Sequence, residues 1–549
     1  AIRPPERPAA GAQLLDLARF VEDYLVAYLR DLKQIWLDLG IDTHFYLNDV
    51  WMPAWPNHWA KKNHVAPVGF DMYPKFIRVK TPLDQPFTIS YVPKVFDAMR
   101  LGGPLMGPEI GCGWLDDRVK VSEEATWQKM MASYLRGSQA NILYPIHDGT
   151  DPDATPYVFG AAFDREGKAG ARIEVMRALG RFVAEWGGLL AASQPLESPV
   201  AVLHNHDATR DVLEFAIDPT RTARETLDLA IDRSVTLAAG SPGLFGALAE
   251  AGYDPDVLEL GRVDLSDLAR HRVCVFSSTG SASDSVREKL TAYVEGGGHL
   301  IVLGTQFPDP TGRLFPGAAR RTWRPQALAV VTGAFVDLAF FNLTEAAKFA
   351  HPLVRFTVEK LQPVMGLIKY GTRAGVWLTD SLSGNRVWAS RFVTYCDVPP
   401  GGREVLGFMG APVGYSAPVG AGSVTFLGTL LGPHLDSPGY YLDAPERGRS
   451  ISEFLARLVA SKGVTPQTTG AEGLEIVLRR VPEGVVVALL NRRAARPFEI
   501  TLPGLTDPHV LERRFSYSGS AAEWDGKAIR GEVASEDVLV MHLSRSLAV

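Results

Sequence analysis

The segment PLMGPEIGCGWLDDRVKVSEEATWQKMMASYLRGSQANILYPIHDG, residues 104–149, carries the clearest fold signal in this chain. It opens with a short apolar run at 104–111, passes through a stretch with helical periodicity, and closes with a second apolar run at 140–149. A buried strand, a helix and another buried strand are typical of a βα unit around a parallel sheet. We therefore expect these two strands to lie parallel in one sheet.

The same alternation extends toward the N-terminus. THFYLND (43–49) and APVGFDMYP (66–74) predict two further strands, and a helix-like pattern covers residues 10–40, with Gly40 at the expected C-cap. Another helical stretch follows at 168–187. A βα barrel needs eight strands, and only four are found before the composition changes near residue 195. Four strands alone leave two open edges and an uncovered apolar face, so we expect something to close them.

The rest of the chain has a different pattern. SPVAVLHN, HRVCVFSST and GGHLIVLGTQ read as strands separated by helices, which predicts an open α/β sheet. From about residue 325 onward, short alternating runs such as AGVWLTD, RVWASRFVTY and GVVVALLN predict β structure of a sandwich-like or barrel-like kind. The chain is thus expected to be an α/β multidomain protein.

Composition excludes several classes of function. With 56 Lys and Arg against 62 Asp and Glu, the formal charge is −6, which argues against a nucleic-acid partner. No stretch approaches 18 uninterrupted apolar residues, so we expect no membrane span. The three cysteines, Cys112, Cys274 and Cys396, are far apart and are expected to be reduced thiols.

Polar or aromatic side chains end each of the four predicted strands. In a βα barrel the carboxyl ends of the strands form the active-site face, so chemistry is expected there. Glu109 is the main candidate: a glycine-rich turn follows it, and glycoside hydrolysis requires two carboxyl groups. Trp114 lies five residues further on and could form an apolar platform for a sugar ring. Further candidates for the pocket, for which helix capping or turn formation is an equal alternative, are Asn48, Asp49, Asp71 and Tyr73.

The segment PLMGPEIGCGWLDD resembles the nucleophile segment of family 35 glycoside hydrolases, the β-galactosidases. YLRGSQANILYPIHDGTDP resembles the next strand of that family, and YVFGAAFDREGKAGARIEVMRAL its exit from the barrel. These matches occur in the family's order over about 70 residues. The resemblance implies Glu109 as the nucleophile and Trp114 as a sugar-contacting residue, with Tyr144 and Tyr157 as candidate hydroxyl contacts.

The resemblance is incomplete at two places. His147 falls in the family's His-Gly-Gly pattern and is a candidate substrate contact, but Asp148 replaces a glycine, which would narrow or re-polarise the pocket and leaves the sugar open. The family's proton donor lies in a Glu-Asn-Glu-like motif at the end of the fourth strand, and residues 1–40 contain no such motif. Glu6 and Glu22 are not assigned that role. The resemblance therefore implies the C-terminal half of a (β/α)8 barrel over 1–195.

The later regions resemble family 42 β-galactosidases, in which the barrel is followed by an α/β trimerisation domain and a small β-domain. AYVEGGGHLIVLG resembles that middle domain, and GAGSVTFLGTLLG the strand that closes it. The resemblance implies a flavodoxin-like open α/β domain at 196–324, a mainly β region at 325–465 that completes it, and a C-terminal β-domain at 466–549. It also implies a homo-oligomer, for which the trimer of that family is the model.

The sequence thus predicts a retaining exo-glycosidase acting on terminal β-galactosides, with Glu109 as nucleophile. The acid/base glutamate would come from an N-terminal half-barrel that is cleaved, separately encoded or not included here. This mechanism requires no metal or organic cofactor. Two alternatives stay open: a non-catalytic carbohydrate-binding or scaffold relative, and a glycosidase for another sugar. We expect a cytoplasmic protein, and a removed N-terminal signal is the alternative.

Overall fold

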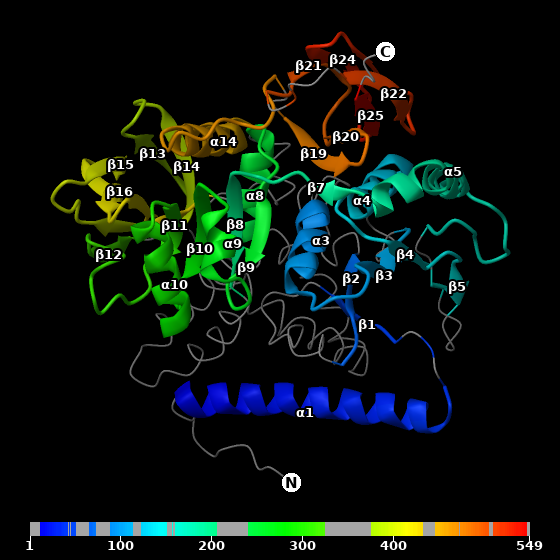
Figure 1. Cartoon of the computed structure of the whole chain (residues 1–549), viewed down its shortest axis with the longest axis horizontal. Coiled ribbons are helices and arrows are strands. Elements are labelled where there is room, and N and C mark those ends of the chain that lie inside the picture. Colours follow the sequence, from blue (N-terminus) through cyan, green and yellow to red (C-terminus); the bar gives the residue numbers. More distant parts are fainter. Residues whose placement is uncertain are drawn as a thin grey trace, which may run out of the picture.

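The computed structural model describes residues 11–41, 43, 45–50, 65–72, 88–113, 122–150, 156–157, 160–205, 240–323, 375–431, 445–470, 473–503, 505 and 509–545. The described chain is a mixed α/β structure in three sheet-based parts, with a long N-terminal helix at one edge (Figure 1). None of the described helices is long and apolar enough to span a membrane. All three cysteines are buried free thiols, as their spacing predicted.

The first part is a four-stranded parallel sheet. Its strands follow one another in chain order, and each is hydrogen-bonded to the next. Strands lie within all four of the predicted apolar runs: β1 (Leu47–Val50), β2 (Val68–Met72), β3 (Met106–Gly111) and β4 (Ala140–Tyr144). Three helices accompany them: α3 (Thr88–Met99), α4 (Glu123–Leu135) and α5 (Arg172–Ala191).

The two faces of this sheet have different surroundings. Phe70 and Ile110 are completely buried, and the Phe70 ring packs edge-on against Phe96 of α3 with centroids 5.7 Å apart. On the opposite face, Ile142 and Tyr144 of β4 are 43% and 39% exposed. Because neighbouring residues of a strand point to opposite faces, helices cover one face, while the other face is exposed at β4 in the described part of the chain.

Helix α1 (Gly11–Asp38) lies at the edge of the molecule, apart from the sheets (Figure 1). It ends as its sequence predicts: Gly40 has φ +76°, and the amide of Ile41 donates to the carbonyl of Trp36 at 3.0 Å, which is a glycine-based C-cap. Most of its described apolar side chains are exposed, although Val26 is buried. Seven of them are more than a third exposed: Phe20, Tyr24, Tyr28, Leu32, Ile35, Trp36 and Leu37. Such a row predicts a surface that another element covers.

The second part is an eleven-stranded mixed sheet. Its parallel half has the order β17-β11-β10-β8-β9, and antiparallel strands continue it on the β17 side. The alternating runs between residues 375 and 431, for which the pattern alone favoured a sandwich or barrel and the family 42 resemblance a completion of the middle domain, therefore continue the α/β sheet. The strands are β8 (Val200–His204), β9 (Asp256–Glu259), β10 (Val273–Thr279), β11 (His299–Thr305), β12 (Ala319–Trp323), β13 (Gly375–Asp380), β14 (Arg386–Cys396), β15 (Arg403–Phe408), β16 (Ala411–Val419), β17 (Gly422–Leu427) and β18 (Thr429–Leu430).

Helices cover this sheet on both sides, as its burial pattern requires. Alternate residues of β10 belong to two different apolar clusters, with Val273 and Val275 in one and Cys274 and Phe276 in the other. The first cluster also contains residues of the four-stranded sheet and of the C-terminal strands, so the three parts share one continuous core. The helices are α8 (Ser241–Glu250), α9 (Leu265–Ala269), α10 (Asp284–Glu295) and α14 (Pro445–Ala460).

The third part consists of two small antiparallel sheets packed around their own apolar cluster. The first has the order β22-β25-β20-β19-β7, in which β7 (Gln194–Pro195) comes from the chain just after α5. The others are β19 (Leu474–Val481), β20 (Gly484–Asn491), β22 (His509–Phe515) and β25 (Val538–Arg545). The second sheet contains β21 (Arg496–Thr501), β23 (Ala521–Trp524) and β24 (Ala528–Val533).

A buried network of charges joins the three parts. Arg136, at the end of α4, forms ion pairs with Asp254 at 2.5 Å and with Glu475 of β19 at 2.8 Å. Arg492 forms a second ion pair with Glu475, and Lys94 of α3 reaches Asp254 at 3.0 Å. Burial alone would raise the pKa of Glu475, but the guanidinium groups of Arg492 and Arg136 outweigh it and lower that pKa. The carboxylate is therefore held ionised inside the protein.

Removing one member of this network should be strongly destabilising. The side chain of Glu475 is 0% exposed, so Glu475→Ala removes a buried carboxylate with which the Arg136 and Arg492 guanidinium groups both pair. We expect a loss of about 3–5 kcal/mol in the free energy of unfolding at pH 7, measured by denaturant titration. Because the folded-state pKa is lowered, this difference should shrink as the pH falls below about 4.3. Glu499→Ala, which removes an exposed partner of Arg530, is the matched control and should change little. A loss below about 1 kcal/mol would contradict this account.

Candidate active site

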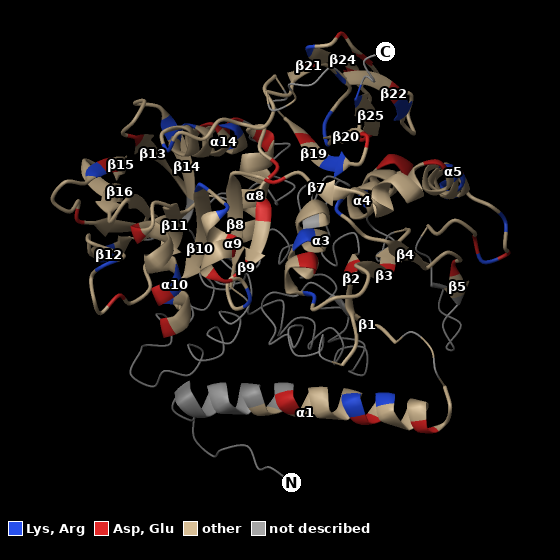
Figure 2. Ribbon diagram, viewed as in Figure 1, with Lys and Arg blue, Asp and Glu red and all other residues tan. Residues whose placement is uncertain are grey.

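The strand register brings three of the predicted site residues onto one face of the parallel sheet. Asn48 pairs with Gly69, and Asp71 pairs with Glu109. Paired residues of neighbouring strands point to the same face, as do residues two apart on one strand. Asn48, Asp71 and Glu109 therefore lie on the open face, at the carboxyl ends of β1, β2 and β3. Figure 2 shows acidic positions on the neighbouring β2 and β3.

The Asn48 amide connects the two carboxylates. Its Nδ2 donates to Oδ2 of Asp71 at 3.2 Å and to Oε2 of Glu109 at 3.1 Å. The two carboxylate oxygens are thus held near each other, because both accept a hydrogen bond from the same amide nitrogen. Asp71 is only 8% exposed, whereas Glu109 is half-buried and Asn48 is exposed. Glu109 is therefore the carboxylate of the pair that a ligand on the open face could reach more directly.

Tyr144 lies on the same face as Glu109. Gly111, two residues after Glu109, pairs with Tyr144 on β4, which places the tyrosine next to the carboxylate strand. The next residues lie differently. His147 is exposed and forms an isolated bridge with Phe163, whereas Asp148 is buried, and its Oδ1 accepts a hydrogen bond from the Ala161 amide at 3.1 Å. Asp148 thus has a structural bond to the following loop.

The side chains of four predicted site residues lie outside the described part of the structure. Tyr73 and Trp114 lie outside the described residues. Asp49 is in β1 and Tyr157 in β6 (Pro156–Tyr157), which pairs with β5 (Gly149–Thr150), but their side chains also lie outside the description. Their roles as sugar contacts stay predictions.

A buried polar cluster beneath the strand ends was not anticipated from the sequence. Lys129 of α4 is 4% exposed, and its Nζ donates to the carbonyl of Gly111, two residues after Glu109. Cys112 donates through Sγ to the Pro145 carbonyl at 2.5 Å, and Arg172 donates to the Gly160 carbonyl at 3.1 Å. The cluster therefore fixes the backbone just after β3 and in the loops that follow β4. The available signal was a lysine inside the otherwise apolar WQKMMA stretch of a predicted helix.

In the described ranges, no three His, Cys, Asp or Glu side chains gather in a way that would hold a metal ion. The chemistry that the described groups can offer is that of carboxylates, an amide and a tyrosine hydroxyl on an open sheet face. Such groups suit nucleophilic attack and hydrogen bonding to a polyhydroxylated ligand.

Comparison with known proteins shows which known structures share this fold. Residues 231–309 match the family described as GLMA-like, second domain. A catalytic mutant of a GH42 β-galactosidase from G. stearothermophilus superposes with a TM-score of 0.65 at 13% identity, over 99% of this chain and 70% of that one. The β-galactosidase from Bacillus circulans sp. alkalophilus gives 0.65 at 13% identity, over 96% of this chain and 68% of that one.

A third solved structure agrees with these two. The β-galactosidase from the haloarchaeon Halorubrum lacusprofundi superposes with a TM-score of 0.63 at 16% identity, over 99% of this chain and 70% of that one. No curated protein matches the sequence. The chain is thus a mixed α/β multidomain protein with the fold of GH42 β-galactosidases.

The buried Lys129 generates a pH prediction. The pKa of Lys129 is lowered to about 7, mainly by burial; Cys112 opposes this shift, and the positive charge of Arg172 adds to it. An unfolded lysine titrates near 10.4, so between about pH 7 and 10 the unfolded chain binds more protons and stability rises with pH. The free energy of unfolding of the wild type should therefore rise relative to Lys129→Met over this range, by at most about 1.4 kcal/mol per pH unit.

Equilibrium denaturation at several pH values measures this difference. Lys168→Met is the matched control, because Lys168 is exposed on a loop, and its difference from the wild type should stay constant. A constant difference for Lys129→Met as well would contradict the buried placement of this amine.

Proposed function

We propose that this chain is the nucleophile-bearing part of a retaining exo-glycosidase that acts on terminal β-galactosides. The observation that carries the proposal is the position of Glu109. It stands at the carboxyl end of a parallel strand, on the open face of the sheet, and is hydrogen-bonded to Asn48 in a chain with the fold of GH42 β-galactosidases. The resemblance of its segment to the family 35 nucleophile motif supports the same assignment.

The reaction is a double displacement. The Glu109 carboxylate attacks the anomeric carbon, the bond to the leaving oxygen breaks, and an acid protonates that oxygen. Water then attacks the glycosyl-enzyme and gives its proton to the same acid/base group, which frees Glu109. Asn48 orients the Glu109 carboxylate in this scheme, and Tyr144 contacts a sugar hydroxyl. No step involves a metal or an organic cofactor.

The acid/base group comes from a partner half-barrel. Within the described part of the chain, β1 and β4 are the outer strands of the parallel sheet, so neither pairs on its far side. Ile142, Tyr144 and Ile146 are 43%, 39% and 46% exposed along β4 and its extension, and α1 presents its apolar row. We propose that a second parallel half with a glutamate at a strand end covers these surfaces. The GH42-like fold further supports a homo-oligomer, built through the eleven-stranded part.

This assignment makes a sharp prediction about leaving groups. A dinitrophenyl leaving group departs without protonation, whereas methoxide needs an acid. The chain alone should therefore cleave 2,4-dinitrophenyl β-galactoside and leave methyl β-galactoside intact. Azide, which attacks a glycosyl-enzyme without base assistance, should accelerate the first reaction. Release of dinitrophenolate, followed by absorbance, should fall to background in Glu109→Gln.

The outcomes separate the candidate functions. Cleavage of the methyl galactoside by the chain alone would show that it supplies its own acid, and Asp71→Asn then tests the second carboxylate held by Asn48. Binding of galactose without any cleavage would favour the non-catalytic carbohydrate-binding alternative. Faster cleavage of another dinitrophenyl glycoside would assign a different sugar. Activity that persists in Glu109→Gln would contradict the proposal.

The Asn48 amide gives a second prediction. Asn48→Ala removes the donor that lies between the Asp71 and Glu109 carboxylates. Hydrogen bonds to charged groups contribute about 1.5–3 kcal/mol, so the rate of dinitrophenolate release should fall about 10- to 100-fold. Asn385→Ala, at an exposed turn of the eleven-stranded part, is the matched control and should retain the full rate. An unchanged rate in Asn48→Ala would show that this amide does not serve the nucleophile.

A further inference from the structure

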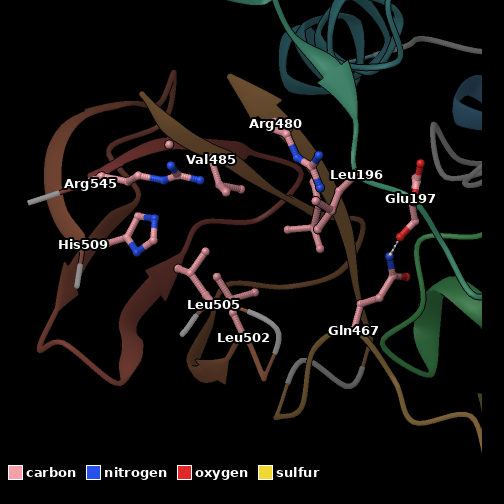
Figure 3. Close-up of a pocket in the computed structure, with 11 residues that line it drawn as sticks. Leu196, Glu197, Gln467, Arg480, Val485, Leu502, Leu505, His509 and Arg545 are labelled. Carbon is pink, nitrogen blue, oxygen red and sulfur yellow. Dashed lines mark hydrogen bonds between the residues drawn. The ribbon is translucent and has the colours of Figure 1, made fainter. Parts of the chain in front are cut away.

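A cavity of about 490 Å³ lies where the C-terminal sheets meet the chain that leaves α5, and none of its described lining residues belongs to β1–β4. On one side are Leu196 and Glu197, which directly follow β7, and on the other is the face formed by β19 and β20 (Figure 3). Gln467 closes one end, where its Nε2 donates to the Glu197 carbonyl at 3.4 Å. A cavity of this volume between two parts of a protein is typical of a small-molecule site.

The floor of the cavity is apolar. Leu478, Val485 and Leu502 are buried members of the core cluster of the C-terminal sheets, and Leu196 and Leu505 pack against that cluster. The cavity thus lies at an edge of this apolar cluster that the described residues leave uncovered. An apolar group placed there would bury surface that the protein itself leaves uncovered, at about 25 cal/mol per Å².

The rim of the cavity is mainly basic. Arg480 of β19 pairs with Val485 of β20, and His509 of β22 pairs with Arg545 of β25, so these side chains come from four neighbouring strands. Figure 3 shows the guanidinium groups of Arg480 and Arg545 on opposite sides of Val485, with His509 beside Arg545. Against these three, the described lining contains one acidic side chain, Glu197. In the described part of the chain, Arg480 has no carboxylate partner.

We propose that this cavity binds a small organic carboxylate with an apolar body. The carboxylate lies between the guanidinium groups of Arg480 and Arg545, where charge-assisted hydrogen bonds form, and the apolar body lies on the leucine and valine floor. The described lining residues include no Trp, Tyr or Phe, so they offer none of the large aromatic stacking surfaces that a neutral sugar would use. The site is separate from the glycosidase proposal and does not depend on it.

Calorimetric titration of the full chain with octanoate tests the proposal. We expect saturable binding at one site, weakened by added salt because the rim charges are solvent-accessible. Octyl β-glucoside has the same apolar chain without the charge, and inorganic phosphate has the charge without the chain. Both should bind at least about tenfold more weakly than octanoate. Equal binding of either probe would overturn the proposed pairing of an anion site with an apolar floor.

Variants locate the site. Arg480→Gln should weaken octanoate binding about tenfold or more, and Arg545→Gln should act in the same direction. Glu197→Gln should tighten binding, since it removes the acidic member of the rim. Arg530→Gln makes the same charge change in the same part of the molecule but outside the cavity, and it should leave the affinity unchanged. Because Arg480 is exposed, its variant should unfold at the wild-type temperature. Unchanged affinity in Arg480→Gln and Arg545→Gln would overturn the proposal.

Discussion

The buried ion pairs of Arg136 with Asp254 and Glu475 are the interaction on which the arrangement of this protein depends. They join the end of α4, the segment that precedes β9, and strand β19. One residue from each of the three parts therefore takes part. Each charge has lost its water, so none can be left without its partner at low cost. Because α4 also carries Lys129, the same helix connects the core network to the backbone that follows Glu109.

This constraint explains how the four-stranded sheet β1–β4 can be firmly packed on one face and exposed at β4 on the other. The helix-covered face of β1–β4 is fixed by α3 and α4, which are held in turn by the eleven-stranded and C-terminal parts. The other face carries Asn48, Asp71, Glu109 and Tyr144 and is left to a ligand or a partner. The site is thus supported from the helix-covered face of the sheet. This support is sufficient to hold the two carboxylates around the Asn48 amide.

Much of this could be predicted from the sequence, because it depends on local pattern. Alternating apolar runs and helices gave the four strands, and parallel strands must end at one edge, so Asn48, Asp71 and Glu109 were expected together. The buried ion-pair network could not be predicted, because Arg136 and Glu475 are 339 residues apart and no local pattern indicates that they pair. Alternation also predicts a strand without predicting its neighbour, so the strand pattern alone did not indicate that β12–β18 continue the α/β sheet, and only the family 42 resemblance implied it. Lys129 was hidden in a helix where a lysine is usually exposed.

The central claim is that Glu109 is the nucleophile, and covalent trapping tests it most directly. 2,4-Dinitrophenyl 2-deoxy-2-fluoro-β-galactoside forms a long-lived glycosyl-enzyme without an acid catalyst, so the proposed partner half-barrel is not needed for this measurement. Mass spectrometry of the digested protein then identifies the labelled residue. The account predicts one fluorogalactosyl group on Glu109. A label on Asp71 or another residue, or no label on a folded chain, would contradict it.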